Sequence, residues 1–135
     1  MIKGMYQIGE VAEAVGLSLR TIRHYEEVGL VPPSGRSAGG FRLYTDDDVE
    51  RLGLVKHMKP LDFTLDEMRQ LLAARDHLAG GASGRRRAEL VERLEAFAAA
   101  AEQRCEALRA QVAAAEAMSE MLRLEASRHR PTVRR

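Results

Sequence analysis

The sequence predicts a mainly α-helical fold in two parts, a small N-terminal domain followed by one long helix. Short stretches of helical periodicity run to about residue 78, and glycine or proline interrupts them. Residues 86–126 contain neither glycine nor proline, and their apolar residues recur in alternating three- and four-residue steps. Aromatic residues make up only 4% of the 135 residues, and alanine is abundant in the second half. This composition favours helices and a coiled coil over a large globular core.

The first predicted helix covers residues 8–15. Ile8, Val11, Ala12 and Val15 are spaced as one apolar helix face. Gly16 follows, and glycine readily adopts the positive φ angle that ends many helices. We therefore expect a short amphipathic helix that stops at Val15.

A second helix is predicted from Leu19 to about Val28. Ser18 stands where an N-cap belongs, Gly29 is placed to end the helix, and the prolines at 32 and 33 prevent it from continuing. Two helices of roughly ten residues, joined by a short turn that contains glycine, form a helix-turn-helix pattern. In such a motif the start of the second helix enters the major groove of DNA.

The residues after the second helix predict a small β-hairpin with a glycine-rich tip, formed by Gly35, Gly39 and Gly40. Arginine and tyrosine side chains flank this tip, which suits a wing that grips the DNA backbone. The net charge of the chain is only +1. Between Gly16 and Tyr44, however, four arginines oppose two glutamates, so we expect this surface to be modestly basic.

Two further helices are predicted, and each begins with a capping box. Thr45 and Asp48 start the first, which runs to about Met58, and Thr64 and Glu67 start the second. In a capping box the two side chains satisfy backbone N–H groups that the first helical turn leaves free. The positions of these helices are therefore indicated by their own sequences.

The segments IGEVAEAVGLSLRTIRHYEEVGLVPP (8–33) and GGFRLYTDDDVERL (39–52) resemble the winged helix-turn-helix of the MerR family of transcriptional regulators. TIRHYE followed by GL, and then GFRLY, is close to the family signature in order and spacing, and the resemblance covers nearly the whole chain. The family commonly has glycine where Asp62 stands in PLDFTL. Aspartate tolerates a left-handed backbone better than most residues, so we expect the turn to be kept.

The helix-turn-helix position and the resemblance together predict a set of DNA contacts. Arginine binds guanine edges or phosphates, whereas threonine and tyrosine hydroxyls usually hold phosphates. His24 is as consistent with plain exposure as with a contact, and Arg42 and Tyr44 either hold phosphate or pack the hairpin. The predicted DNA-binding residues are Ser18, Arg20, Thr21, Arg23, His24, Tyr25, Arg36, Arg42 and Tyr44.

The long helix carries a heptad seam over more than four repeats, with Ser119 as its one polar member. A helix of about 40 residues spans about 60 Å, too long to pack on the small head alone, so it needs a helical partner. The resemblance implies that this partner is the same helix of a second subunit, running antiparallel. The predicted dimerisation residues are Val91, Leu94, Phe97, Ala98, Ala101, Cys105, Leu108, Val112, Ala115 and Leu122.

We predict four regions from these patterns. Residues 1–78 form the winged helix-turn-helix domain, with a short lead-in before Tyr6, and residues 79–87 (AGGASGRRR) form a flexible linker. Residues 88–126 form the coiled-coil helix, and the basic tail 127–135 is disordered. The three arginines at 85–87 are either a solvated charge run or contacts to DNA or to the partner subunit.

The chain has a single cysteine, Cys105, so neither an intrachain disulfide nor a multi-cysteine metal site can form. Cys105 is either a small buried apolar residue or, near the two-fold axis of an antiparallel dimer, a redox-sensitive intersubunit disulfide. The four histidines have no ligand spacing, and we predict neither a metal nor another cofactor. Metal-sensing members of the family carry cysteines near the start of the long helix and after it, and this sequence has none there. The signal is therefore not specified.

The resemblance implies a homodimeric regulator that binds a pseudo-palindromic promoter site and distorts its DNA so that RNA polymerase can engage. Two alternatives remain: an effector-independent architectural or developmental regulator, and a coiled-coil adaptor whose head binds protein. No nucleophile–base pair or phosphate-cradling loop indicates an enzyme. The sequence has no signal-peptide pattern and no apolar run of about 20 residues, so we expect a cytoplasmic protein.

Overall fold

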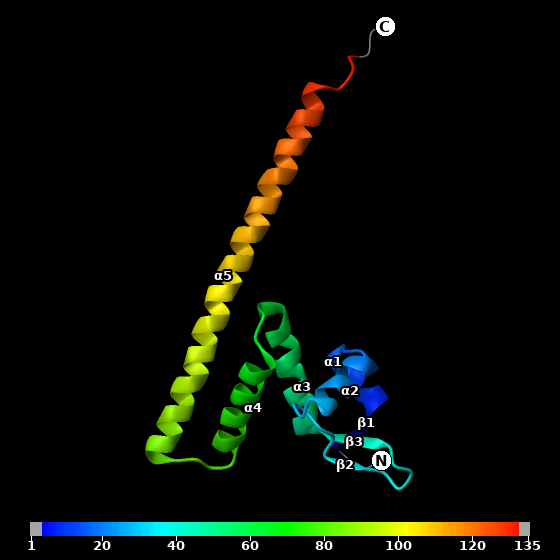
Figure 1. The fold of residues 1–135 in the computed structure, drawn as a ribbon, viewed down its shortest axis with the longest axis vertical. Helices are drawn as coiled ribbons and strands as arrows, with labels where there is room; N and C mark the ends of the chain where they lie inside the picture. Colours follow the sequence, from blue (N-terminus) through cyan, green and yellow to red (C-terminus); the bar gives the residue numbers. More distant parts are fainter. Residues whose placement is uncertain (1–3, 133–135) are drawn as a thin grey trace. The chain divides into compact units, whose positions relative to one another are not determined.

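A computed structural model describes residues 4–132 of the chain (Figure 1). It confirms a mainly helical fold with a small sheet and a long C-terminal helix. The chain divides after Glu95 into two compact units. In order, the elements are β1 (Met5–Gln7), α1 (Ile8–Val15), α2 (Leu19–Glu27), β2 (Gly35–Arg36), β3 (Arg42–Thr45), α3 (Asp46–Met58), the 3₁₀ helix η1 (Lys59–Leu61), α4 (Leu65–Ala79) and α5 (Gly84–Arg128).

The turn between α1 and α2 follows the predicted caps. Gly16 adopts the left-handed conformation at φ 72°, and its N–H donates to the carbonyl of Ala12 at 2.9 Å. The Ser18 hydroxyl accepts from the backbone N–H of Thr21 at 3.0 Å. Gly29 ends α2 with φ 71°. Local chemistry thus sets the lengths of both helices.

Both predicted capping boxes are present. Thr45 and Asp48 cap the start of α3, and Thr64 and Glu67 cap the start of α4. Asp62, between the two helices, is left-handed at φ 60°, as expected for a position where glycine also fits. These caps confirm the predicted starts of α3 and α4.

The sheet has three antiparallel strands in the order β1-β3-β2, with Tyr6 opposite Tyr44 and Arg36 opposite Arg42. The hairpin β2–β3 was predicted, and we call residues 34–45 the wing. Strand β1 was not: its residues fell in the predicted lead-in, because three residues are too few to show an alternating pattern. The start of the chain therefore supports the wing.

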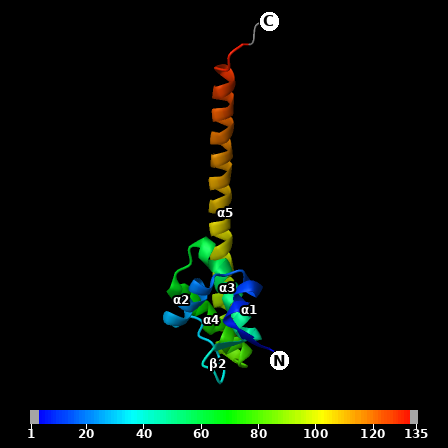
Figure 2. The same cartoon turned by 90° about the vertical axis from the view of Figure 1, so that its right-hand side faces the viewer.

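The core of the first unit lies between the two helices of the motif and α3. Both views place α1 and α2 together beside α3 (Figure 1, Figure 2). The fully buried side chains come from the strands, from four of the helices and from the start of α5. They are Val11, Ile22, Val31, Tyr44, Leu52, Val55, Leu72 and Leu90. Because residues from so many segments meet there, the position of α2 depends on the whole unit.

Side chains from α3 and α4 hold the ends of the motif's helices. Lys56 Nζ donates to the carbonyl of Val15 at 2.6 Å, and Arg69 Nη2 donates to the carbonyl of Val28 at 2.5 Å. Both carbonyls lie at helix C-termini, where the helix dipole favours a cation. The motif is therefore fixed to the helices that follow it.

Helix α5 is longer than predicted. It begins at Gly84, so only residues 80–83 of the predicted linker 79–87 lie outside a helix. Arginine has a high helix propensity, which explains why residues 85–87 join the helix. At the other end α5 continues to Arg128, into the predicted tail, and residues 133–135 lie outside the described part.

Apolar side chains of α5 remain exposed along the second unit. Leu108, Val112 and Leu122, all predicted seam residues, are 42%, 56% and 58% exposed. Cys105 is a free thiol and is half-buried. In residues 4–132 no helix combines the length and the apolar character that crossing a membrane requires. The stripe on α5 is accordingly a surface for another protein segment to cover.

Candidate nucleic-acid interface

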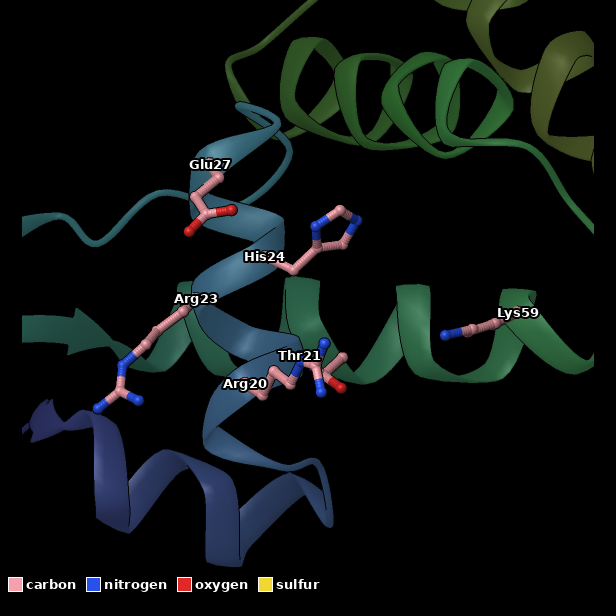
Figure 3. A pocket seen from close by; sticks show the side chains of 6 residues that line it. All are labelled: Arg20, Thr21, Arg23, His24, Glu27 and Lys59. Carbon is pink, nitrogen blue, oxygen red and sulfur yellow. The ribbon is translucent and has the colours of Figure 1, made fainter.

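The exposed face of α2 gathers most of the predicted contacts. Arg20, Arg23 and His24 are exposed and Thr21 is half-buried, because the helical repeat turns these positions away from Ile22 in the core. They line an open cavity of about 680 Å³ on the first unit. Figure 3 shows the lining side chains, which are Arg20, Thr21, Arg23, His24, Glu27 and Lys59.

The two arginines on this face are not engaged elsewhere. Among residues 4–132, no side chain forms an ion pair with Arg20 or Arg23. Ser18, by contrast, has its hydroxyl occupied: it accepts from the N–H of Thr21 and donates to the Thr21 hydroxyl at 2.8 Å. Ser18 and Thr21 therefore act first as the start of α2, and the free guanidinium groups are available for an anionic ligand.

Lys59 belongs to the same surface, although the sequence gave no signal for it. It lies in η1, directly after α3, and the packing of α3 beside the motif brings it to the cavity next to α2 (Figure 3). Three cations, Arg20, Arg23 and Lys59, thus face one carboxylate, Glu27. The surface has a net positive charge, as binding to phosphates requires.

Two predicted contacts lie in the core instead. Tyr25 is 3% exposed and Tyr44 is fully buried, and neither hydroxyl has a hydrogen-bond partner among the described residues. Tyr25 follows Ile22 by three positions and so shares its inward face, whereas Tyr44 is placed inward by the strand register. Burial raises the pKa of both tyrosines. The structure therefore does not bring these two hydroxyls to the exposed face.

The wing arginines converge on one carboxylate. Arg42 Nε donates to Glu26 Oε2 at 2.5 Å, and Arg36 Nη2 donates to Glu26 Oε1 at 3.0 Å. The hydrogen bond to Glu26 raises the pKa of Arg42. Glu26 lies on α2, so the predicted contacts of the wing and those of the helix are connected through it. Its pairing was not predicted, because the partners are 10 and 16 residues apart.

The base of the wing is held by a second carboxylate. Asp48, only 7% exposed, accepts from the Ser34 hydroxyl at 2.5 Å and from the backbone N–H of Thr45 at 2.9 Å. One side chain thus caps α3 and fixes the start of the hairpin. Within residues 4–132, no histidine, cysteine, aspartate or glutamate side chains gather in threes as ligands for a metal ion.

Comparison with known proteins places this geometry in a family. The model of the MerR HTH family of regulatory proteins matches residues 6–75, and the MerR DNA-binding model matches residues 49–124. A probable heavy metal-dependent transcriptional regulator of Haemophilus influenzae is 44% identical over 70 residues, 52% of this chain and 55% of the relative. The transcriptional activator TipA of Streptomyces coelicolor is 41% identical over 111 residues, 76% of this chain and 42% of TipA. The chain therefore matches about half the length of these curated relatives.

A solved structure extends the similarity to the long helix. The crystal structure of HiNmlR, described as a MerR family regulator lacking the sensor domain and bound to promoter DNA, aligns with a TM-score of 0.58 at 25% identity. The alignment covers 91% of this chain and 88% of that one. Since two family models each match more than half of the sequence, the chain belongs to the MerR family of helix-turn-helix regulatory proteins.

Proposed function

We propose that this protein is a homodimeric, sequence-specific DNA-binding transcriptional regulator. The observation that carries the proposal is the exposed face of α2, where Arg20, Arg23 and Lys59 surround an open cavity. A helix of this motif fits the major groove, and arginine reads guanine there with two hydrogen bonds. The promoter DNA bound to HiNmlR, a structural relative, supports the same ligand for this chain.

In this proposal α2 reads bases and the wing holds the backbone. Arg20 lies in the first turn of α2 and is assigned to a base edge, whereas Arg23, Lys59 and Arg42 are assigned to phosphates. Tyr25 and Tyr44 are left out because both are buried. Ser18 supports the interface by capping α2.

The dimer forms through α5. Val91, Leu108, Val112 and Leu122 expose apolar surface at positions spaced as one heptad seam. A second copy running antiparallel is the proposed occupant, and it separates two heads by the length of the coiled coil. Each head would then read one half of a pseudo-palindromic promoter site.

The family suggests action through DNA deformation. A dimer that bends and untwists an over-long promoter spacer allows RNA polymerase, the further partner in this proposal, to engage. The deformation costs on the order of several kcal/mol, which phosphate contacts must offset. The chain acts by binding, without catalysis, in the cytoplasm where bacterial DNA lies.

The experiment is selection from a randomised duplex pool by the purified full chain, with the molar mass in solution measured in parallel. Enrichment of a pseudo-palindrome by a dimer is the expected result. A protein that binds no duplex at low salt, or binds with no salt dependence, would favour the adaptor alternative, in which the head binds protein. A monomer that still selects a site would refute the dimer and leave DNA binding standing.

A further inference from the structure

Glu26 connects the helix that carries the proposed base contacts to the wing. Its two carboxylate oxygens are divided between the wing arginines, Oε2 for Arg42 and Oε1 for Arg36. Arg36 is fixed further by its Nη1, which donates to the carbonyl of Gly40 at 3.3 Å. The Glu26 side chain is only 19% exposed, so the pairing is shielded from solvent better than most surface ion pairs.

The arrangement leaves donors available to a ligand. Arg42 spends Nε on Glu26, and among the described residues nothing accepts from its two terminal nitrogens. Those nitrogens are part of the planar fork with which arginine binds phosphate. One carboxylate opposes two guanidinium groups, so the cluster remains positive overall. It can therefore hold its arginines in place and still attract the DNA backbone.

We propose that Glu26 is a positioning residue for DNA binding, which fixes the wing arginines relative to Arg20 and Arg23 on the same helix. The inference rests on the proposed function. With Glu26 in place, wing and helix present one preformed recognition surface, and fewer side-chain rotamers are lost when DNA binds. Without it, Arg36 and Arg42 sample many rotamers, and their contacts no longer depend on the register of α2.

Charge alone predicts the opposite effect. A carboxylate beside DNA repels phosphates, so its neutralisation strengthens binding if the carboxylate does nothing else. Glu27 provides the matched control, because it is the next residue on α2, is exposed, and forms no ion pair within residues 4–132. Glu26→Gln and Glu27→Gln remove the same charge from neighbouring positions, and only the first breaks the arginine pairing.

The test compares both full-length variants on the selected operator and on a scrambled duplex over a range of salt concentrations. Glu27→Gln should bind the operator as tightly as wild type or tighter. Glu26→Gln should bind it about threefold to tenfold more weakly, while its affinity for the scrambled duplex follows that of Glu27→Gln. Equal operator affinities for the two variants would overturn the role of Glu26.

Two further variants separate positioning from general damage. When Arg36 and Arg42 are both alanine, no guanidinium remains to be placed, so adding Glu26→Gln should cause no further loss of operator affinity. Glu26→Asp keeps the carboxylate and should recover part of the affinity lost in Glu26→Gln. A further loss in the first case, or no recovery in the second, would contradict the inference. A wild-type protein that fails to distinguish operator from scrambled DNA would instead overturn the proposed function itself.

Discussion

Lys56 of α3 lies with its Nζ 2.6 Å from the carbonyl oxygen of Val15, the last residue of α1. The next residue, Gly16, makes this contact possible: a Cβ atom there would come within 2.7 Å of the same nitrogen. The glycine thus serves two purposes, since it turns the chain left-handed and leaves room for the lysine. A cation at this position also favours the negative end of the helix dipole.

Replacing Lys56 should destabilise the fold. Lys56→Met removes the hydrogen bond but keeps most of the aliphatic chain, so we expect the free energy of unfolding to fall by about 1 kcal/mol. Urea unfolding followed by circular dichroism measures this change. Lys59→Met is the control, because Lys59 is exposed and should be neutral for stability. Equal stabilities for the two variants would mean that the Lys56 contact contributes nothing.

Lys59→Met should instead weaken DNA binding. If Lys59 holds one phosphate, the slope of log K against log salt concentration should become shallower by about 0.9. Fluorescence anisotropy with a labelled operator at several salt concentrations gives the slope. An unchanged slope would place Lys59 away from the DNA, whatever happened to the affinity at a single salt concentration.

The two arginines of α2 should differ in kind. Arg23→Ala should weaken binding to every duplex and flatten the salt slope, as expected for a phosphate contact. Arg20→Ala should relax the preference at one base position, at a cost of about 1–3 kcal/mol for the preferred base. Repeating the selection with each variant tests this. If neither substitution alters affinity or preference, α2 does not lie in the groove.

Removing the buried hydroxyls of Tyr25 and Tyr44 should stabilise the protein. Neither hydroxyl has a partner among the described residues, and a buried unpaired polar group costs about 1–3 kcal/mol. We expect Tyr25→Phe and Tyr44→Phe each to raise the free energy of unfolding and to leave operator affinity unchanged. Loss of operator affinity without loss of stability would return these tyrosines to the set of DNA contacts.

The same tyrosines should make the fold sensitive to alkali. Burial raises the pKa of both above the ordinary value, so the folded state holds each phenolic proton more tightly than the unfolded chain does. Their contribution to stability is complete below about pH 10, the unfolded value, and is lost as the pH rises toward the higher folded pKa. Urea midpoints measured at rising pH should fall in this window for wild type and less steeply for Tyr44→Phe.

Features set by neighbouring residues could be predicted from the sequence. Ser18, Thr45 and Thr64 cap helices through bonds to residues three positions on, and Gly16 and Asp62 adopt left-handed turns because of their own side chains. Their signals are local, and the structure confirms each of them. The heptad seam on α5 was read in the same way, and its role in dimerisation remains a prediction.

Features that join distant segments could not be predicted. Glu26 meets arginines across the wing, Lys59 reaches the face of α2 from another helix, and β1 pairs with a strand some 40 residues away. Each depends on how the elements pack. Tyr25 is a different case, because its spacing from Ile22 already indicated the inward face. A strict reading of periodicity would have placed it in the core.

Strand β1 has a practical consequence for anyone who handles this protein. Residues 5–7 occupy one side of β3, so β3 is a central strand with both rows of backbone groups paired. Trimming these residues, or holding them away with a rigid N-terminal fusion, would turn β3 into an exposed edge. Unprotected edges invite strand pairing between molecules and aggregation. Affinity tags therefore belong at the C-terminus, or behind a flexible spacer at the N-terminus.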